Sequence, residues 1–291
     1  MLPGFPRSLG LGLVLLVGAL RGLAADPATN PPPALDSEQI LRRFLERSKG
    51  TPERVAAQHH ACLRRTSTEE LTSEGKVKER KVREFEVELR GEKQHLRLLR
   101  LDGRLPSDRE GRRETGKESE MKKKYGERQD KARSQGPDFI DERIVHRYHF
   151  ATNGVEWING RPAYLLRFSP KPGLEVKEVA DRALNRLTGR LWIDAEEFEL
   201  VKLDAHLEQP LSFVGGIVAT VERMEFDLAR ERHADGFWFN THFSSLAIGR
   251  KLFTGFHVRT QIDQNHFRAL PVTAQGASER RTTAIDEPAT R

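Results

Sequence analysis

The sequence predicts a mainly β protein of the α+β class, in which an amphipathic helix covers an antiparallel sheet. Segments in which apolar and polar residues alternate recur between residues 60 and 267, and a period of two is typical of strands. Turn pairs separate these segments at Asp102-Gly103, Asn159-Gly160 and Asp235-Gly236. Such pairs favour short antiparallel connections. Apolar residues with helical spacing precede all of the strands, between Ile40 and Leu45.

Residues 188–207, TGRLWIDAEEFELVKLDAHL, form the clearest predicted hairpin. Apolar residues occupy alternate positions on both sides of a polar turn, at Leu191, Ile193, Val201, Leu203, Ala205 and Leu207. The pattern predicts one apolar face and one polar face, with Trp192 and Asp194 on the polar face. Asp194 can also shape the turn through its side chain. Because a lone hairpin is marginal in water, further strands and a covering helix must bury the apolar face.

Residues 1–24 have the three-part pattern of a secretory signal peptide. Arg7 precedes an apolar run, and small or short side chains follow it up to Ala24 and Ala25. The run is shorter than the ~20 residues of a membrane-spanning helix. We therefore expect cleavage near Ala24 or Ala25, with an uncleaved membrane anchor as the alternative. Residues 25–35 include three consecutive prolines and form a predicted spacer that cannot join a sheet interior.

Residues 36–272 form the predicted folded domain. Asp36 or Ser37 caps a helix that ends near Gly50, and its apolar side consists of Ile40, Leu41, Phe44 and Leu45. Besides the hairpin, strands are predicted at residues 60–66, 78–89, 95–101, 139–150, 155–158, 163–168, 213–227, 228–233, 237–246 and 250–267, with a further turn at Asn153-Gly154. Residues 178–187 form a connector that can hold one helix, and residues 273–291 form a disordered tail.

Residues 104–137 interrupt the strand pattern with a charged insert. Residues 103–137 hold eleven Lys or Arg against seven Asp or Glu, with few large apolar side chains to offset the entropy of ordering. We expect a mobile, solvated insert, and a charged helix over residues 114–133 is the alternative. Its functional role would be contact with envelope proteins or with anionic lipid headgroups.

The formal net charge of +6 does not predict a nucleic-acid partner. The basic excess lies in the leader and in the charged insert, and no patterned basic face or stacking motif is present. Cys62 is the only cysteine, which excludes an internal disulfide and a multi-cysteine metal site. We expect its thiol to be a small buried hydrophobe.

The sequence carries no motif of catalysis or cofactor binding. It lacks a Gly-rich phosphate loop, a nucleophile elbow and a zincin helix. His146 and His149 would point to opposite faces of a strand, which disfavours a shared metal ion, and Glu196 and Glu197 lie in a turn. We therefore expect no enzyme activity, no cofactor and no metal. A hydrolase acting on envelope material stays open, because spacing cannot show carboxylates that meet across strands.

Several short motifs follow one another in order: YLLRFSP at residues 164–170, LTGRLWID at residues 187–194, residues 199–203, and Gly236-Phe237-Trp238. As an ordered set they resemble the outer-membrane lipoprotein-sorting proteins of the LolA/LolB-like superfamily, in a longer variant with a charged insert. The resemblance extends from about Ile40 to Phe267.

The resemblance implies an unclosed, curved antiparallel half-barrel, with helices over its mouth and an apolar cavity for acyl chains. It also implies export to the periplasm or cell envelope of a diderm bacterium, and a lipid or lipoprotein acyl chain as the partner. The candidate cavity residues are Phe44, Leu191, Ile193, Val201, Leu203, Phe226 and Phe239. The alternative is an envelope scaffold or stress-sensing binding module whose core is filled by its own side chains.

Overall fold

The structure, a computed structural model, describes residues 32–48, 59–90, 93–130, 140–177, 179–213, 219–252 and 254–271. The chain divides into the units Met1–Pro31 and Pro32–Arg291, and all of the described residues belong to the second. The predicted signal peptide and the predicted C-terminal tail therefore lie outside the described residues.

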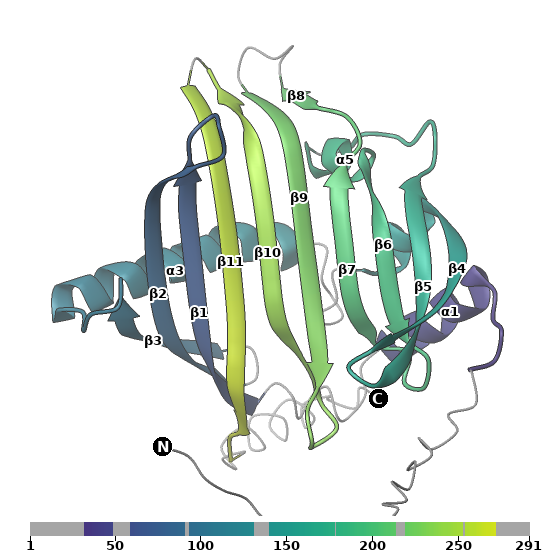
Figure 1. The fold of residues 1–291 in the computed structure, drawn as a ribbon, viewed down its shortest axis with the longest axis horizontal. Helices are drawn as coiled ribbons and strands as arrows, with labels where there is room; N and C mark the ends of the chain where they lie inside the picture. The colour runs from purple at the N-terminus through teal and green to yellow at the C-terminus, as the bar shows by residue number, and fades with distance from the viewer. Residues whose placement is uncertain are drawn as a thin grey trace, which may run out of the picture. The chain divides into compact units, whose positions relative to one another are not determined.

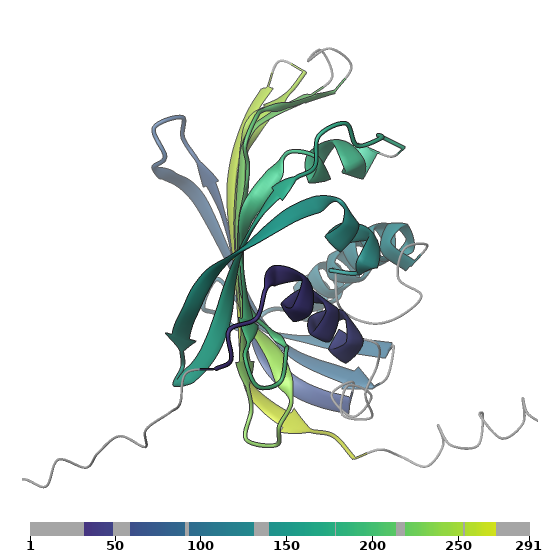
Figure 2. The same ribbon diagram turned by 90° about the vertical axis from the view of Figure 1, so that its right-hand side faces the viewer.

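An open antiparallel sheet dominates the fold (Figure 1). Its 11 strands follow the order β3-β2-β1-β11-β10-β9-β7-β6-β5-β4, and β8 pairs with β9 beside this path. The strands are β1 (His59–Leu71), β2 (Val77–Arg90), β3 (Lys93–Leu101), β4 (Tyr148–Ile158), β5 (Arg161–Pro170), β6 (Leu187–Asp194), β7 (Leu200–Leu207), β8 (Leu211–Phe213), β9 (Ala219–Arg232), β10 (Trp238–Lys251) and β11 (Thr254–Ala269). Because β3 and β4 remain as edges, the curved sheet does not close (Figure 2). The expected mainly β class and unclosed antiparallel sheet are confirmed.

The pairing of β1 with β11 joins the beginning of the sheet to its end. The two strands run antiparallel from His60 opposite Ala269 to Glu70 opposite Val258. This pairing places the meander β3-β2-β1 directly beside the last strand. Most other strands pair with the strand that follows them in the chain, through a short connection. The pairing of β1 with β11 instead joins two segments from opposite ends of the domain.

The helices α1 (Ser37–Ser48), α3 (Asp108–Asp130), α4 (Glu142–His146) and α5 (Val179–Leu184) lie on one side of the sheet. They are behind the strands in Figure 1 and to their right in Figure 2. We call this the helix side of the sheet, and the opposite face the open side.

Helix α1 starts with a reciprocal cap of the type expected before an amphipathic helix. Asp36 Oδ1 accepts a hydrogen bond from the backbone N–H of Gln39 at 2.8 Å, and Gln39 Oε1 accepts one from that of Asp36 at 3.2 Å. The buried residues of the helix are Ile40, Leu41 and Phe44, as predicted. Near its other end, Arg47 Nε lies 3.1 Å from the carboxylate of Glu199, which ties α1 to the sheet.

The main core lies between α1 and the helix side of β4 to β7 and β9. Its buried members include Ile40, Phe44, Tyr164, Leu166, Leu191, Ile193, Leu203 and Leu228. Each large apolar side chain removed from water in this way contributes about 1.5–3 kcal/mol. Helix α1 is therefore the cover that the predicted hairpin requires.

The predicted polar face of the hairpin is covered as well, which corrects the simple two-faced interpretation. Trp192 is 3% exposed and Asp194 is 0% exposed. Trp192 belongs to a second cluster on the open side with Leu165, Val201 and Trp238. Alternation indicates which residues share a face, but it does not show whether neighbouring strands cover the other face.

Asp194 shapes the turn, as expected. Its Oδ1 atom accepts hydrogen bonds from the backbone N–H groups of Glu196 at 3.0 Å and Glu197 at 2.7 Å. The same carboxylate receives Arg161 Nε at 2.7 Å and Nη2 at 2.9 Å. A buried carboxylate with this many donors is fully paired.

Over its described part, the charged insert has the helical form that the sequence left as an alternative to a solvated segment. Helix α3 spans Asp108–Asp130 and begins earlier than the expected residue 114. Glu114 of this helix is 0% exposed. Ion pairs hold α3 to the sheet, so this helix does not depend on apolar burial over residues 108–120. Residues 131–137 of the insert lie outside the described residues.

Two local predictions before residue 160 are wrong. Residues Glu142–His146 form the short helix α4 instead of part of a strand. The pair Asn153-Gly154 is not a hairpin turn, because β4 continues through it with a register shift. The turn lies at Asn159-Gly160, where φ is 51° and 77°, as predicted. An Asn-Gly pair serves a bulge as well as a turn, so the pair alone does not distinguish them.

Candidate functional site

Beyond the main core, the helix side of β9, β10 and β11 carries a continuous and mainly apolar surface. It consists of half-buried side chains: Met224, Phe226, Phe243, Ser245, Ala247, Val258, Thr260 and Ile262. We call these eight residues the helix-side strip. The register pairs them directly across neighbouring strands, and direct antiparallel partners share a face. On the open side the same strands present mainly polar residues, Arg223, Glu225, Asp227, Ser244, Arg259 and Gln261, together with the half-buried Leu246 and Ile248.

The structure brings most of the predicted acyl-binding residues together on the helix side. Phe44, Leu191, Ile193 and Leu203 are buried members of the main core, and Phe226 packs against that core at its edge. Phe226 is only half-buried, and the helix-side strip continues from it across β10 and β11.

The other two predicted residues lie elsewhere. Val201 is buried on the open side with Trp192 and Trp238, because a register irregularity beside it reverses the expected alternation. Phe239 stacks on Phe267, with ring centroids 4.4 Å apart and an interplanar angle of 8°. Neither residue joins the main core.

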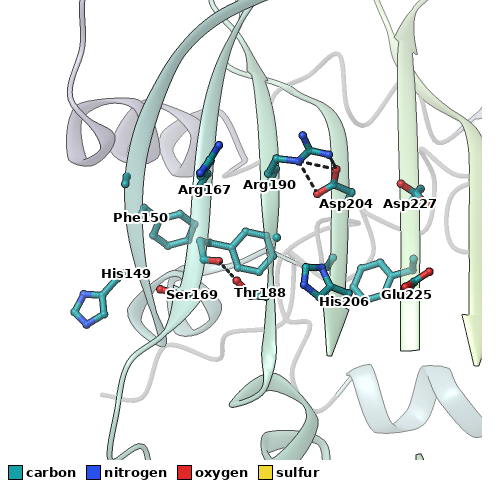
Figure 3. A pocket seen from close by; sticks show the side chains of 15 residues that line it. His149, Phe150, Arg167, Ser169, Thr188, Arg190, Asp204, His206, Glu225 and Asp227 are labelled. Carbon is teal, nitrogen blue, oxygen red and sulfur yellow. Dashed lines mark hydrogen bonds and ion pairs between the residues drawn. The ribbon is translucent and has the colours of Figure 1, made fainter. Parts of the chain in front are cut away.

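A hollow of about 650 Å³ crosses β4, β5, β6, β7 and β9 on the open side (Figure 3). We call it the open-side trough. One row of its side chains contains Arg167, Arg190, Asp204 and Asp227. The second row contains His149, Ser169, Thr188, His206 and Glu225. The floor between the rows is formed by Phe150, Phe168, Gly189, Ala205 and Phe226.

Gly189 permits the close approach of β6 and β7 under the trough. A Cβ atom at this position would run into the backbone of Asp204 and Ala205. Only glycine fits such an approach. The sheet can therefore bend here without a side chain between the two strands.

The first row of the trough is an ordered array of charges. The register places Arg167 beside Arg190, Arg190 beside Asp204, and Asp204 beside Asp227. Arg190 Nε donates to Asp204 Oδ2 at 2.9 Å, and this hydrogen bond raises the pKa of the Arg190 guanidinium. The carboxylate of Asp227 accepts a hydrogen bond from the Ser244 hydroxyl at 3.3 Å. Among the described residues, the exposed guanidinium of Arg167 has no salt-bridge partner.

A separate charged cluster attaches α3 to β1 and β2. Lys81 Nζ lies 2.9 Å from Glu114 Oε2, and Arg83 Nη1 lies 3.2 Å from Glu118 Oε1. Arg64 Nη2 donates to Glu118 Oε2 at 2.8 Å. The insert is thus anchored by carboxylates of the helix and cations of the sheet.

Within the described ranges, no group of three or more His, Cys, Asp or Glu residues could hold a metal ion. His146 lies in α4 and His149 lies in β4. None of the helices in the described part of the chain is both long and apolar enough to span a membrane.

Sequence reasoning missed the open-side trough. Its polar residues sit at alternate positions of the predicted strands, for example Arg167 and Ser169 on β5, which the sequence makes visible. Their grouping depends on the register of five strands, including the pairing of β7 with the later strand β9. No local pattern predicts that pairing.

No protein-family model matches the chain, and no curated protein matches its sequence. Among solved structures, the chain is similar to a domain described as an outer-membrane lipoprotein-sorting protein from Vibrio parahaemolyticus (10% identity, TM-score 0.33, covering 84% of this chain and 96% of that one). It is similar to a LolA superfamily protein from Nitrosomonas europaea (13% identity, TM-score 0.27, covering 82% and 96%). It is also similar to the MucA/MucB complex of Pseudomonas aeruginosa (12% identity, TM-score 0.24, covering 80% and 98%).

These structures include lipoprotein-sorting and LolA-superfamily proteins, the classes that the sequence motifs resemble. Because the identities and TM-scores are low, they carry no argument about what this chain binds.

Proposed function

We propose that this protein is a non-enzymatic binding protein of the cell envelope that holds the acyl chain of a lipid or lipoprotein against the helix-side strip. The observation that carries the proposal is the helix-side strip itself. Its mainly apolar side chains on β9, β10 and β11 are half-buried, and the strip meets the edge of the main core at Phe226. The signal-peptide pattern of residues 1–24 supports export to the envelope.

The dimensions of the helix-side strip suit one acyl chain. Three neighbouring strands span about 10 Å, and the four-residue step from Phe243 to Ala247 spans about 13 Å along the strand. Each methylene removed from water gains about 0.8 kcal/mol. Contact with even a short stretch of chain therefore yields measurable affinity, provided that the apolar surface stays accessible.

Adjacent serines on β10 offer a matched test. Ser245 lies on the helix-side strip between Phe226 and Thr260, and Ser244 lies on the open side between Asp227 and Gln261. Ser245→Trp would fill the strip, whereas Ser244→Trp places the same bulk on the other face. Binding of a fluorescent fatty acid to the purified protein measures the difference, and circular dichroism confirms the fold of both variants.

We expect Ser245→Trp to weaken binding of the fluorescent fatty acid at least about tenfold, equivalent to the loss of roughly two buried methylenes. Ser244→Trp should bind like the parent protein. Equal affinity in the two folded variants, or no binding by the parent protein, would contradict the proposal. Native mass spectrometry of protein purified from the envelope provides a second readout, because co-purified lipid should appear as an added mass.

A second candidate function is contact with an anionic surface or envelope partner through the charged insert. Helix α3 exposes basic side chains at Arg109, Arg112, Arg113 and Lys117, which favours an acidic partner. Deletion of residues 104–137 separates the two functions. Loss of co-sedimentation with phosphatidylglycerol vesicles, with fatty-acid binding intact, would support this second role. Unchanged co-sedimentation, or none by the parent protein, would contradict it.

A further inference from the structure

We propose that the open-side trough is a second binding site, on the face opposite the helix-side strip, and that it takes a short zwitterionic peptide. The peptide carboxylate would pair with Arg167 and its terminal ammonium with Asp227. This site is independent of the acyl-chain proposal. It rests on the order of charges across the sheet and on the hollow beside them.

Among the described residues, the two ends of the charge array, Arg167 and Asp227, have no salt-bridge partner. Arg167 and Arg190 are direct cross-strand neighbours, and so are Asp204 and Asp227. Like charges directly opposite each other are unfavourable. The central pair neutralises itself, because Arg190 bonds to Asp204 at 2.9 Å. The cation of Arg167 therefore remains at the β5 end of the array and the anion of Asp227 at the β9 end. A ligand with an anion beside Arg167 and a cation beside Asp227 would offset the repulsion within each pair of like charges.

The separation of the two end charges sets the length of the ligand. Three strand spacings lie between Arg167 on β5 and Asp227 on β9, which amounts to about 14 Å. An extended peptide spans at most about 3.3–3.6 Å per residue, so roughly four residues connect the two ends. The hollow of about 650 Å³ is within the usual range of ligand sites.

The second row of the trough supplies hydrogen-bonding groups for the middle of such a peptide. Ser169, Thr188 and His206 lie beside the floor between the charged ends (Figure 3). The Thr188 hydroxyl donates to the carbonyl oxygen of Phe168 at 2.8 Å and keeps its acceptor capacity for a peptide N–H. These hydrogen-bonding side chains match peptide groups better than they match an aliphatic chain.

The same residues disfavour other classes of ligand. A polyanion such as a nucleotide would meet Glu225 and Asp227 at the acidic end, and a polycation would meet Arg167 at the basic end. An aliphatic ligand would have to desolvate both charges without pairing them. A ligand with an anion at one end and a cation at the other avoids repulsion at both ends of the trough and pairs the charges that it desolvates.

Tetra-alanine with free termini is the probe, and nuclear magnetic resonance titration of the full-length protein is the measurement. The variants are Arg167→Gln and Asp227→Asn, which replace exposed side chains and should leave the fold intact by circular dichroism. The controls are Arg182→Gln and Glu222→Gln, which remove exposed charges outside the trough. Two capped probes, one acetylated and one amidated, each remove one terminal charge.

We expect each trough variant to weaken binding of tetra-alanine about tenfold, as for a lost charge-assisted hydrogen bond, and each control variant to leave it unchanged. The acetylated peptide should lose its sensitivity to Asp227→Asn, and the amidated peptide its sensitivity to Arg167→Gln. No binding of tetra-alanine up to millimolar concentration would overturn the proposal. So would binding that the control variants weaken equally, or the opposite pattern of sensitivity to the caps.

Discussion

The ammonium of Lys81 on β2 lies 2.9 Å from the carboxylate of Glu114 on α3, and the Glu114 side chain is only 1% exposed. Residues 108–120 of the helix contain no large apolar side chain. The usual burial of an apolar stripe therefore cannot hold this part of α3 on the sheet. Ion pairs at the centre of the contact must supply the attachment.

Replacement of Glu114 by Gln should loosen α3. Removal of one partner from a buried ion pair costs about 3–5 kcal/mol, but Lys81 is 31% exposed and can regain water. We expect a loss of about 2 kcal/mol in the free energy of unfolding and faster amide exchange over residues 108–120. Urea unfolding and hydrogen exchange measure the two effects. Glu120→Gln, at an exposed position of the same helix, should change neither, and equal effects of both variants would refute the assignment.

The attachment of α3 should weaken in acid. Burial raises the pKa of Glu114. The ammonium groups of Lys81 and Lys117 lower this pKa by a larger amount, so it lies below its ordinary value. A lowered folded-state pKa contributes stability above the unfolded value of about 4.3, and this stability is lost as the pH falls through the folded value. The difference in unfolding free energy between the parent protein and Glu114→Gln should thus shrink below about pH 4.5. A constant difference from pH 3 to pH 7 would argue against this titration.

Asp194 should be the most sensitive position of the β6–β7 turn. Its side chain is 0% exposed and lies 2.7 Å from Arg161 Nε. Asp194→Ala removes the acceptor of two backbone N–H groups and the buried partner of Arg161, which keeps only Glu196 at 2.9 Å and Glu197 at 3.7 Å. We expect a loss of about 3 kcal/mol in urea unfolding. Asp194→Asn, which retains an acceptor for the turn, should lose less. Glu196→Gln, at a carboxylate that is 62% exposed, should lose less than about 1 kcal/mol. A similar loss in all three variants would be inconsistent with this role.

Cys62 should be inert in the folded protein. Its side chain is buried, and burial raises the pKa of the thiol to about 11. At pH 8 the folded chain therefore holds about 100-fold less thiolate than an unfolded chain with a pKa near 9. Reaction with a chromogenic disulfide reagent at pH 8 should be slow until urea unfolds the protein. The raised pKa also means that the stability contributed by the protonated thiol declines as the pH rises from about 9 through 11. Rapid stoichiometric labelling of folded protein would show that the thiol is accessible.

Most secondary structure was predictable because local patterns specify it. The spacing of Ile40, Leu41 and Phe44 predicted α1 and its buried face, and period-two alternation predicted β6 and β7. The predictions failed where one local signal serves two structures, as at Asn153-Gly154. The charged insert was expected to be mobile, with a helix only as the alternative. Ion pairs with the sheet stabilise helix α3, although the composition of this segment favours a solvated chain.

The candidate sites were less predictable, for a related reason. The resemblance named Phe226 as a candidate cavity residue together with Leu191 and Ile193, but it could not show that Leu191 and Ile193 would be buried under α1 while Phe226 remained half-buried. Exposure depends on which elements cover a strand. That is a property of packing between distant segments.

The sequence by itself determined the class of fold, because strand alternation, turn pairs and an amphipathic helix are encoded within short windows. Only the tertiary structure decided the pairing of β1 with β11 and of β7 with β9. These pairings bring together residues that are distant in the chain, and they place the charges of Arg167, Arg190, Asp204 and Asp227 in one row. A charge acts on its neighbours in space, so its role follows from register across the sheet and cannot be obtained from spacing along the chain.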